Sequence, residues 1–205
     1  GATKERHTTL VQYSAPAKPK KGDDFNDLVW RATDWAPQDD VDGDGGGWFP
    51  VPFSGKGDSI RAMKSFGNYL LIYGRWQTYV LSGLNEQTWT LRKLGDYGAL
   101  SNGSVAEMDG LVYSVSRQGI LVRTDGTTIE PVPGMEPIRK WLKDKIDDVL
   151  NTGGDENDTS GDQNWFLRLW SHDGYLWMAL PVPSGNRTTL VYDPRSESFW
   201  ETDLP

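Results

Sequence analysis

The chain has 205 residues, including 23 Gly, 12 Pro and 10 Trp, with no Cys and a net charge of −8. The length allows one ample core or two small ones, and the many turn residues and large rings favour an all-β protein over a helical one. The absence of Cys excludes disulfides and Cys-type zinc sites. No apolar run approaches the roughly 18 residues of a membrane-spanning helix, so we expect no membrane partner.

Residues 1–27 are predicted to form an extended N-terminal arm or linker. A short strand is expected at Thr8–Tyr13, and two prolines among lysines at residues 16–22 favour a solvated connector. Residues 1–21 carry a net charge of +4, so the remaining residues carry −12. The arm is therefore either a plain solvated loop or a segment that docks on an acidic neighbour. The docking interpretation assigns partner binding to Lys18, Lys20 and Lys21.

Asn26–Trp35 alternates apolar with polar or small residues and is predicted to be a half-buried strand. The Gly-rich loop Asp39–Gly47 follows, and its aspartates match the first half of a calcium-binding loop. Counted from Asp40 as the first position, the twelfth position is Val51, where such a loop needs a bidentate Glu. The loop is therefore either a calcium site of other geometry or a plain acidic loop, and no other cofactor is expected. The calcium interpretation assigns the metal to Asp40, Asp42 and Asp44.

One hairpin unit recurs three times in the rest of the chain. Each copy has a turn containing Gly, an apolar strand, a break and a second strand. The copies occupy Phe66–Gly83, Met108–Gly126 and His172–Asp193. Their predicted strands are Tyr69–Tyr73 with Gln77–Leu81, Leu111–Val115 with Ile120–Arg123, and Tyr175–Leu180 with Thr189–Tyr192.

Additional strands flank each hairpin and complete a four-stranded unit. They are expected at Asp58–Met63 and Thr88–Leu94, at Ser104–Met108 and Thr128–Val132, and at Trp165–Trp170 and Ser198–Thr202. The turn glycines Gly67 and Gly110 are 43 residues apart, and Gly174 follows 64 residues later, with a 27-residue insertion in between. A four-stranded blade that repeats every 40–45 residues or so is typical of β-propellers.

The insertion, residues 137–163, begins with the one convincing helix of the sequence, Pro137–Leu150. Its apolar residues fall on one helical face, Pro137 suits the first helical position, and Asn151 with the following glycines suits the end. The apolar face consists of Ile138, Trp141, Leu142, Ile146, Val149 and Leu150.

The expected fold is therefore all-β, with β-propeller-like repeated antiparallel sheets and one inserted amphipathic helix near 137–150. After the arm, one domain is expected over residues 28–205, with blade units at about 28–63, 58–94, 104–132 and 164–202. This amounts to a partial or small propeller, at the lower limit of about four blades for closure. Closure is expected to need the helix, neighbouring subunits or additional sequence. Because the chain begins with Gly instead of Met, we interpret it as part of a longer one.

Three stretches of the chain resemble propeller-type virion proteins of tailed bacteriophages, namely the tail hub, stabilisation and nozzle proteins. The motifs are Thr78–Gly83, Gly98–Ala106 and Asp109–Ile120, and the similarity covers about residues 58–202. The resemblance implies a structural protein located in the phage tail or neck, which forms an oligomer around the DNA channel. It implies copies of itself or other tail, portal or adaptor proteins as partners, with DNA passing nearby but not specifically bound.

The sequence offers little that favours an enzyme. It has only two histidines, His7 and His172, and no G-x-S-x-G elbow, P-loop or HExxH motif. The stretch Ser171–Trp177 resembles the Asp-box of sialidase-type propellers, but its Gly falls one residue early, which favours a plain turn. We therefore expect no catalytic residues.

Two other classes of protein stay open. A carbohydrate-binding propeller would stack exposed Trp rings on sugars, whereas rings that fill the gaps between blades would be buried. The candidate rings are Trp48, Trp76, Trp89, Trp165 and Trp200. A cellular propeller that scaffolds protein partners is the third alternative.

Overall fold

The structure is a computed structural model that describes residues 9–13, 18–19, 28–29, 47–54, 58–83, 88–151, 167–180 and 188–202. The chain divides into two compact units, Gly1–Pro52 and Phe53–Pro205, and each is described by itself. No helix within the described part of the chain is long and apolar enough to span a membrane.

The described residues of the first unit form two small antiparallel sheets. In one, β1 (Leu10–Tyr13) pairs with β4 (Gly47–Pro50), and in the other β2 (Lys18–Pro19) pairs with β3 (Leu28–Val29). The strand predicted near the start of the arm is thus confirmed as β1. The blade expected at 28–63 and the domain boundary after residue 27 stay predictions, because residues 20–27 and 30–46 lie outside the described residues.

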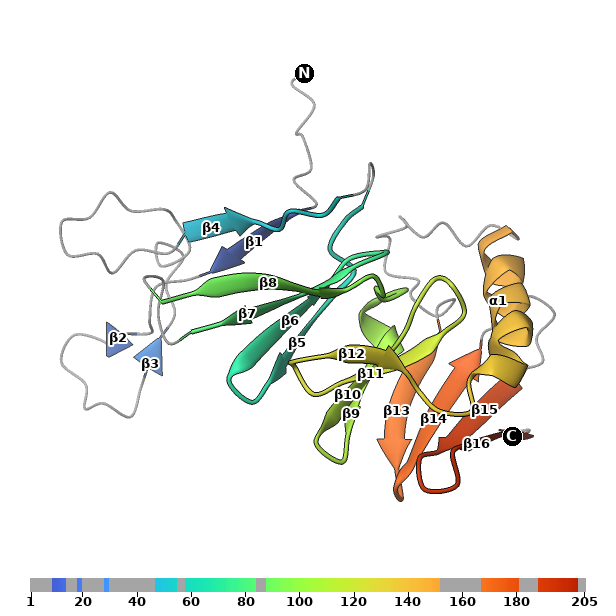
Figure 1. The fold of residues 1–205 in the computed structure, drawn as a ribbon. Coiled ribbons are helices and arrows are strands. Elements are labelled where there is room, and N and C mark those ends of the chain that lie inside the picture. Colours follow the sequence, from blue (N-terminus) through green and yellow to red (C-terminus); the bar gives the residue numbers. More distant parts are fainter. Residues whose placement is uncertain are drawn as a thin grey trace. The chain divides into compact units, whose positions relative to one another are not determined.

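The second unit contains three antiparallel sheets of four strands each, and the strands of every sheet follow the order of the chain (Figure 1). The first sheet comprises β5 (Ala62–Phe66), β6 (Tyr69–Tyr73), β7 (Thr78–Ser82) and β8 (Thr90–Gly95). The second sheet comprises β9 (Val105–Met108), β10 (Leu111–Val115), β11 (Leu121–Thr124) and β12 (Ile129–Pro131). The third sheet comprises β13 (Arg168–His172), β14 (Tyr175–Leu180), β15 (Thr188–Asp193) and β16 (Ser198–Thr202). The predicted all-β fold of repeated antiparallel sheets is confirmed.

Tight turns set the register of the second and third sheets. Asp109 and Gly110 have φ values of 51° and 73°, and Asp173 and Gly174 have 52° and 78°. Two successive left-handed residues match the right-handed twist of the strands that they join, which favours the Asp-Gly pair. The stretch that resembles an Asp-box is therefore a hairpin turn, as predicted.

The first strand of the first sheet lies further along the chain than predicted. The expected strand was Asp58–Met63, but β5 begins at Ala62. Asp58 is buried, and its Oδ1 accepts hydrogen bonds from Ser59 N at 2.8 Å and Arg75 N at 2.6 Å. The segment before Ala62 is thus tied to the break between β6 and β7 by a side chain, which strand periodicity does not reveal.

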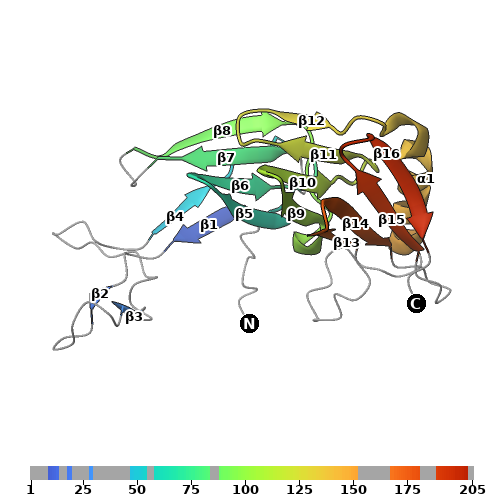
Figure 2. The same ribbon diagram turned by 90° about the horizontal axis from the view of Figure 1, so that it is seen from below.

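The first strands of the three sheets lie along one edge of the unit. β13 contacts β9, and β5 contacts the short 3-10 helix η2 (Asn102–Ser104) that leads into β9. Figure 2 shows β5, β9 and β13 on one side and the last strands β8 and β12 on the other. The sheets are thus arranged as successive blades, although they form no closed ring within the described residues.

Both faces of the second sheet are buried. On one side Val112 packs in a cluster with Leu71 and Tyr73 of the first sheet. On the other side Tyr113 and Val115 belong to a larger cluster with the third sheet. The members of that cluster from the third sheet are Leu169, Leu176, Met178, Leu180, Leu190 and Tyr192.

The helix α1 (Glu136–Asn151) confirms the predicted inserted helix. Leu142 and Ile146 are buried in the larger cluster, while Lys140 and Asp144 form an exposed ion pair at 2.6 Å. A methyl group on Gly119, in the break between β10 and β11, would lie 2.6 Å from the backbone nitrogen of Lys143. The helix therefore lies directly on this break.

Candidate functional site

The third sheet has one covered face and one open face. Its residues that pack toward the second sheet alternate along each strand, so the residues between them lie on the opposite side. We call this second side the open face. It consists of Arg168, Trp170 and His172 from β13, Tyr175, Trp177 and Ala179 from β14, Thr189, Val191 and Asp193 from β15, and Ser198, Trp200 and Thr202 from β16.

Aromatic side chains cross the open face from strand to strand. The strand register aligns Trp170 with Trp177, Trp177 with Val191, and Val191 with Trp200. Trp170 is 36% exposed and Trp200 is 40% exposed, although both are large apolar side chains. Trp177 is partly exposed, whereas Val191 and Thr189 of the same face are 0% and 2% exposed. Large apolar side chains that are exposed on one face of a sheet are typical of an interaction surface.

Ring geometry further defines this row. The rings of Trp170 and Trp177 are stacked, with centroids 6.2 Å apart and an interplanar angle of 18°. Those of Tyr175 and Trp200 meet edge to face, with centroids 5.4 Å apart and an angle of 82°. The Trp177 indole donates a hydrogen bond to the backbone oxygen of His172 at 3.3 Å. These contacts hold the rings in place before any partner binds.

Charged groups lie at the turn ends of the open face. His172 Nε2 and Asp173 Oδ2 are 3.3 Å apart. Asp193 accepts hydrogen bonds from the Ser196 hydroxyl at 2.8 Å and from Arg195 N at 2.9 Å, and these bonds lower the pKa of its carboxyl group. The Asp193 carboxylate therefore stabilises the turn between β15 and β16.

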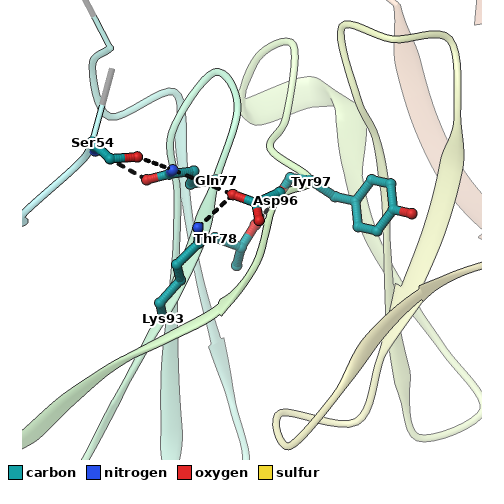
Figure 3. A network of polar contacts seen from close by, with 6 residues as sticks. All are labelled: Ser54, Gln77, Thr78, Lys93, Asp96 and Tyr97. Carbon is teal, nitrogen blue, oxygen red and sulfur yellow. Dashed lines mark hydrogen bonds and ion pairs between the residues drawn. The ribbon is translucent and has the colours of Figure 1, made fainter. Parts of the chain in front are cut away.

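A polar network joins loops at one end of the first sheet (Figure 3). Ser54 N donates to Gln77 Oε1 at 3.1 Å, and Gln77 Nε2 donates to Ser54 Oγ and, at 3.3 Å, to Asp96 Oδ1. Asp96 also pairs with Lys93, and the Thr78 hydroxyl donates to the backbone oxygen of Tyr97. Since these groups bind one another, the network is a structural join between the loops.

Polar contacts also tie the first strands together along their shared edge. Lys64 Nζ of β5 lies 3.1 Å from Glu107 Oε2 of β9. The Ser171 hydroxyl of β13 donates to the backbone oxygen of the same Glu107 at 3.0 Å. Glu107 thus connects all three sheets at an exposed edge of the second unit.

The groups with shifted pKa values are moved away from neutrality. Burial raises the pKa values of Tyr73 and Tyr113 and raises that of Tyr192 to about 12. Hydrogen bonds from Thr127 and Thr128 lower the pKa of Asp125 to about 2. Each of these groups therefore keeps one protonation state at neutral pH, unlike a general acid or base tuned to work there.

The predicted metal and partner residues fall in parts of the chain that the structure does not describe. Asp40, Asp42, Asp44, Lys20 and Lys21 lie outside the described residues, and only the backbone of Lys18 is described, in β2. The calcium site and the basic docking segment therefore stay predictions.

The structure describes the side chains of three of the five candidate Trp residues. Trp200 lies on the open face, Trp76 is 38% exposed in the break between β6 and β7, and Trp89 is partly buried. The guanidinium carbon of Arg117 is 5.8 Å from the centre of the Trp76 ring. Trp165 and the side chain of Trp48 lie outside the described part.

Sequence reasoning missed Trp170 and Trp177 as members of a site. A signal for this pair was present, because the two residues lie at equal distances from the two-residue turn at Asp173 and Gly174. A two-residue hairpin places such residues opposite each other on the same face.

No protein-family model matches this chain, and the search of curated proteins finds no match either.

Proposed function

We propose that this chain is a non-enzymatic structural protein of a tailed-phage virion, located in the tail hub, nozzle or neck. In this proposal several copies surround the DNA channel and contact one another or other tail, portal or adaptor proteins. The observation that carries the proposal is the series of three blade-like sheets that ends in an open aromatic face. The sequence motifs that resemble phage tail proteins support it.

The buried interfaces between the sheets suit a mechanical role. Leu71, Val112 and Leu176 are at most 1% exposed, and they belong to the clusters that join successive sheets. Full burial of such a side chain contributes roughly 1.5–3 kcal/mol. Successive sheets would therefore resist separation and could serve as a rigid wall.

The edge formed by the first strands is the side that would face the channel. Lys64 and Glu107 pair there, Arg168 of β13 is exposed on the same edge, and the chain as a whole carries a net charge of −8. Nonspecific DNA binding depends on clustered Lys and Arg that displace counterions from phosphates. A wall whose basic side chains are few and dispersed would let DNA pass without retaining it.

The proposal is tested in virions of a phage that encodes this chain. Immunogold labelling with an antibody against the full chain should mark the tail or neck in electron micrographs. An antibody against the major capsid protein serves as the positional control. Purified, intact virions that lack the chain by both labelling and mass spectrometry would contradict the proposal.

A carbohydrate-binding module is the second candidate, and the exposed rings of the open face favour it. Trp170 and Trp177 are nearly parallel, and such rings can stack on the apolar faces of sugars. A glycan array probed with the full chain and with Trp170→Ala tests this function. Binding that the substitution abolishes would support it, and silence across the array would count against it.

A further inference from the structure

In the first and second sheets, the face that is equivalent to the open face is covered by the next sheet of the chain. The turns at Gly67, Gly110 and Gly174 align the three hairpins, and the third residue after each turn is Leu71, Tyr113 and Trp177 respectively. Leu71 is 0% exposed and Tyr113 is 2% exposed because they lie in the clusters between successive sheets. At the equivalent place on the third sheet, Trp177 is partly exposed and lies beside Trp170, which is 36% exposed.

The other end of this series also presents an apolar face. In the first sheet, Ala62, Leu71 and Tyr73 pack toward the second sheet, so the alternate residues lie on the opposite side. We call that side the leading face, and its residues are Met63, Ser65, Leu70, Ile72, Tyr79, Leu81, Leu91 and Lys93. Met63 is 48% exposed, and Leu70, Leu81 and Leu91 are partly exposed. At the centre of this face Ile72 is 0% exposed and Tyr79 is 6% exposed, and the Phe53 ring meets Tyr79 edge to face with centroids 5.5 Å apart. The exposed apolar part of the leading face is therefore the surface around this centre, at Met63, Leu70, Leu81 and Leu91.

We propose that the open face of one copy docks on the leading face of a second copy, so that the stacking of sheets continues from one copy to the next. This inference rests on the proposed function and deepens it by naming the surface and the partner. The proposed contact repeats the two interfaces within the chain. In each of these, the face of one sheet that is equivalent to the open face packs on the opposite face of the next sheet. A contact between two different surfaces is heterologous and generates a ring when the rotation between copies closes.

The shape of the open face favours a protein sheet over a polysaccharide. Its row of aligned residues spans all four strands, which lie about 4.8 Å apart in a sheet. A polysaccharide platform needs rings in one plane, but Tyr175 and Trp200 are nearly perpendicular to each other. Rings at mixed angles suit contact with the irregular side chains of a facing sheet, such as Met63 and Leu81.

The inference is tested by sedimentation velocity on the full chain and four variants. Trp170→Glu and Trp200→Glu place a charge on the open face, and Met63→Glu places one on the leading face. Trp76→Glu is the matched control, because Trp76 is as exposed as Trp200 but lies in the break between β6 and β7. We expect each face variant to weaken self-association by at least about 30-fold and the control to change it by less than about 3-fold.

Mixing the variants distinguishes the proposed contact from a symmetric one. Trp200→Glu and Met63→Glu should each be monomeric alone and should form 1:1 dimers when mixed, because each retains one working face. If Met63→Glu alone still forms dimers, the contact is between two open faces and the proposal is wrong. The proposal would also be overturned if both open-face variants associated as strongly as the wild type. A wild-type chain that stays monomeric and binds glycans through Trp170 would overturn it as well.

Folding and the proposed function are checked separately. Circular dichroism and thermal unfolding should show that each variant is folded. If one of the two open-face variants does not fold, the other still tests the open face. A chain found in virions whose face variants assemble like the wild type would contradict only this inference. A chain that assembles through the two faces but is absent from virions would contradict only the proposed function.

Discussion

Two glycines with nearly the same φ lie in different surroundings. Gly110 has a φ of 73° and Gly119 has a φ of 71°. A methyl group on Gly110 would meet no atom within 4 Å, whereas one on Gly119 would lie 2.6 Å from the backbone nitrogen of Lys143. The pair therefore separates the cost of a left-handed backbone from the cost of a steric clash.

We expect Gly110→Ala to lower the free energy of unfolding by about 1–2 kcal/mol, the cost of a left-handed residue with a side chain. Gly119→Ala should lose about 1–3 kcal/mol more, because the methyl group must displace the first half of α1. Urea unfolding of the two variants measures both values. Equal losses would contradict the close contact between the helix and the β10–β11 break.

The Asp125 carboxylate accepts hydrogen bonds from Thr127 N at 2.8 Å, Thr128 N at 3.0 Å and the Thr127 hydroxyl at 2.7 Å. These bonds favour the ionised form and lower the pKa from 3.8 to about 2 in the folded chain. A depressed folded-state pKa stabilises the fold at pH values above the unfolded pKa. This stabilisation is lost as the pH falls from about 4 to about 2.

Asp125→Asn should therefore destabilise the chain at pH 6 and make little difference at pH 2. Thermal unfolding of both proteins between pH 2 and pH 6 checks this expectation. Asp144→Asn is the control at an exposed carboxylate that pairs with Lys140 on the helix surface. A stability difference between wild type and Asp125→Asn that stays constant with pH would contradict the assigned role.

At the scale of the element, α1 is held by the apolar face that the sequence predicts. Leu142 is 0% exposed within the core shared by the second and third sheets. Leu142→Ala should lower the free energy of unfolding by about 2–5 kcal/mol, because it removes buried methyl groups and leaves a cavity. Lys140→Ala, on the exposed side of the helix, should change it by about 0.5 kcal/mol or less. Chemical denaturation that shows no difference between the two would mean that the helix does not pack as described.

The strands next to tight turns could be predicted from the sequence alone. β6, β10 and β14 have the predicted bounds, because a turn containing Gly fixes where each strand begins and an apolar run shows where it ends. β5 could not be placed, because the Asp58 carboxylate ties the preceding segment to the β6–β7 break. A side-chain hydrogen bond to a distant backbone leaves no periodic signal in the sequence.

The candidate site was harder to predict than the strands. Alternation shows that Trp170, Trp177 and Trp200 share a face, but not whether another sheet covers that face. Whether another sheet covers this face depends on how many sheets follow it in the assembly, and the pattern of residues along one strand does not contain that information. Of the rings proposed from the sequence, Trp200 is the one described on the open face.

In the whole assembly that we propose, the sheets of one copy are completed by those of another. Both ends of the series of sheets expose apolar side chains, Met63 at one end and Trp170 and Trp200 at the other. Exposed apolar surface of this kind favours association, because burial removes it from water. Each copy has two different ends, so association continues from copy to copy until the rotation between copies closes a ring.

Native mass spectrometry of the full chain over a range of concentrations tests this claim most directly. We expect one discrete oligomer that grows at the expense of monomer as the concentration rises. Trp200→Glu should abolish this oligomer, and Trp76→Glu should not. A chain that stays monomeric at every concentration, or an oligomer that both substitutions leave intact, would contradict it.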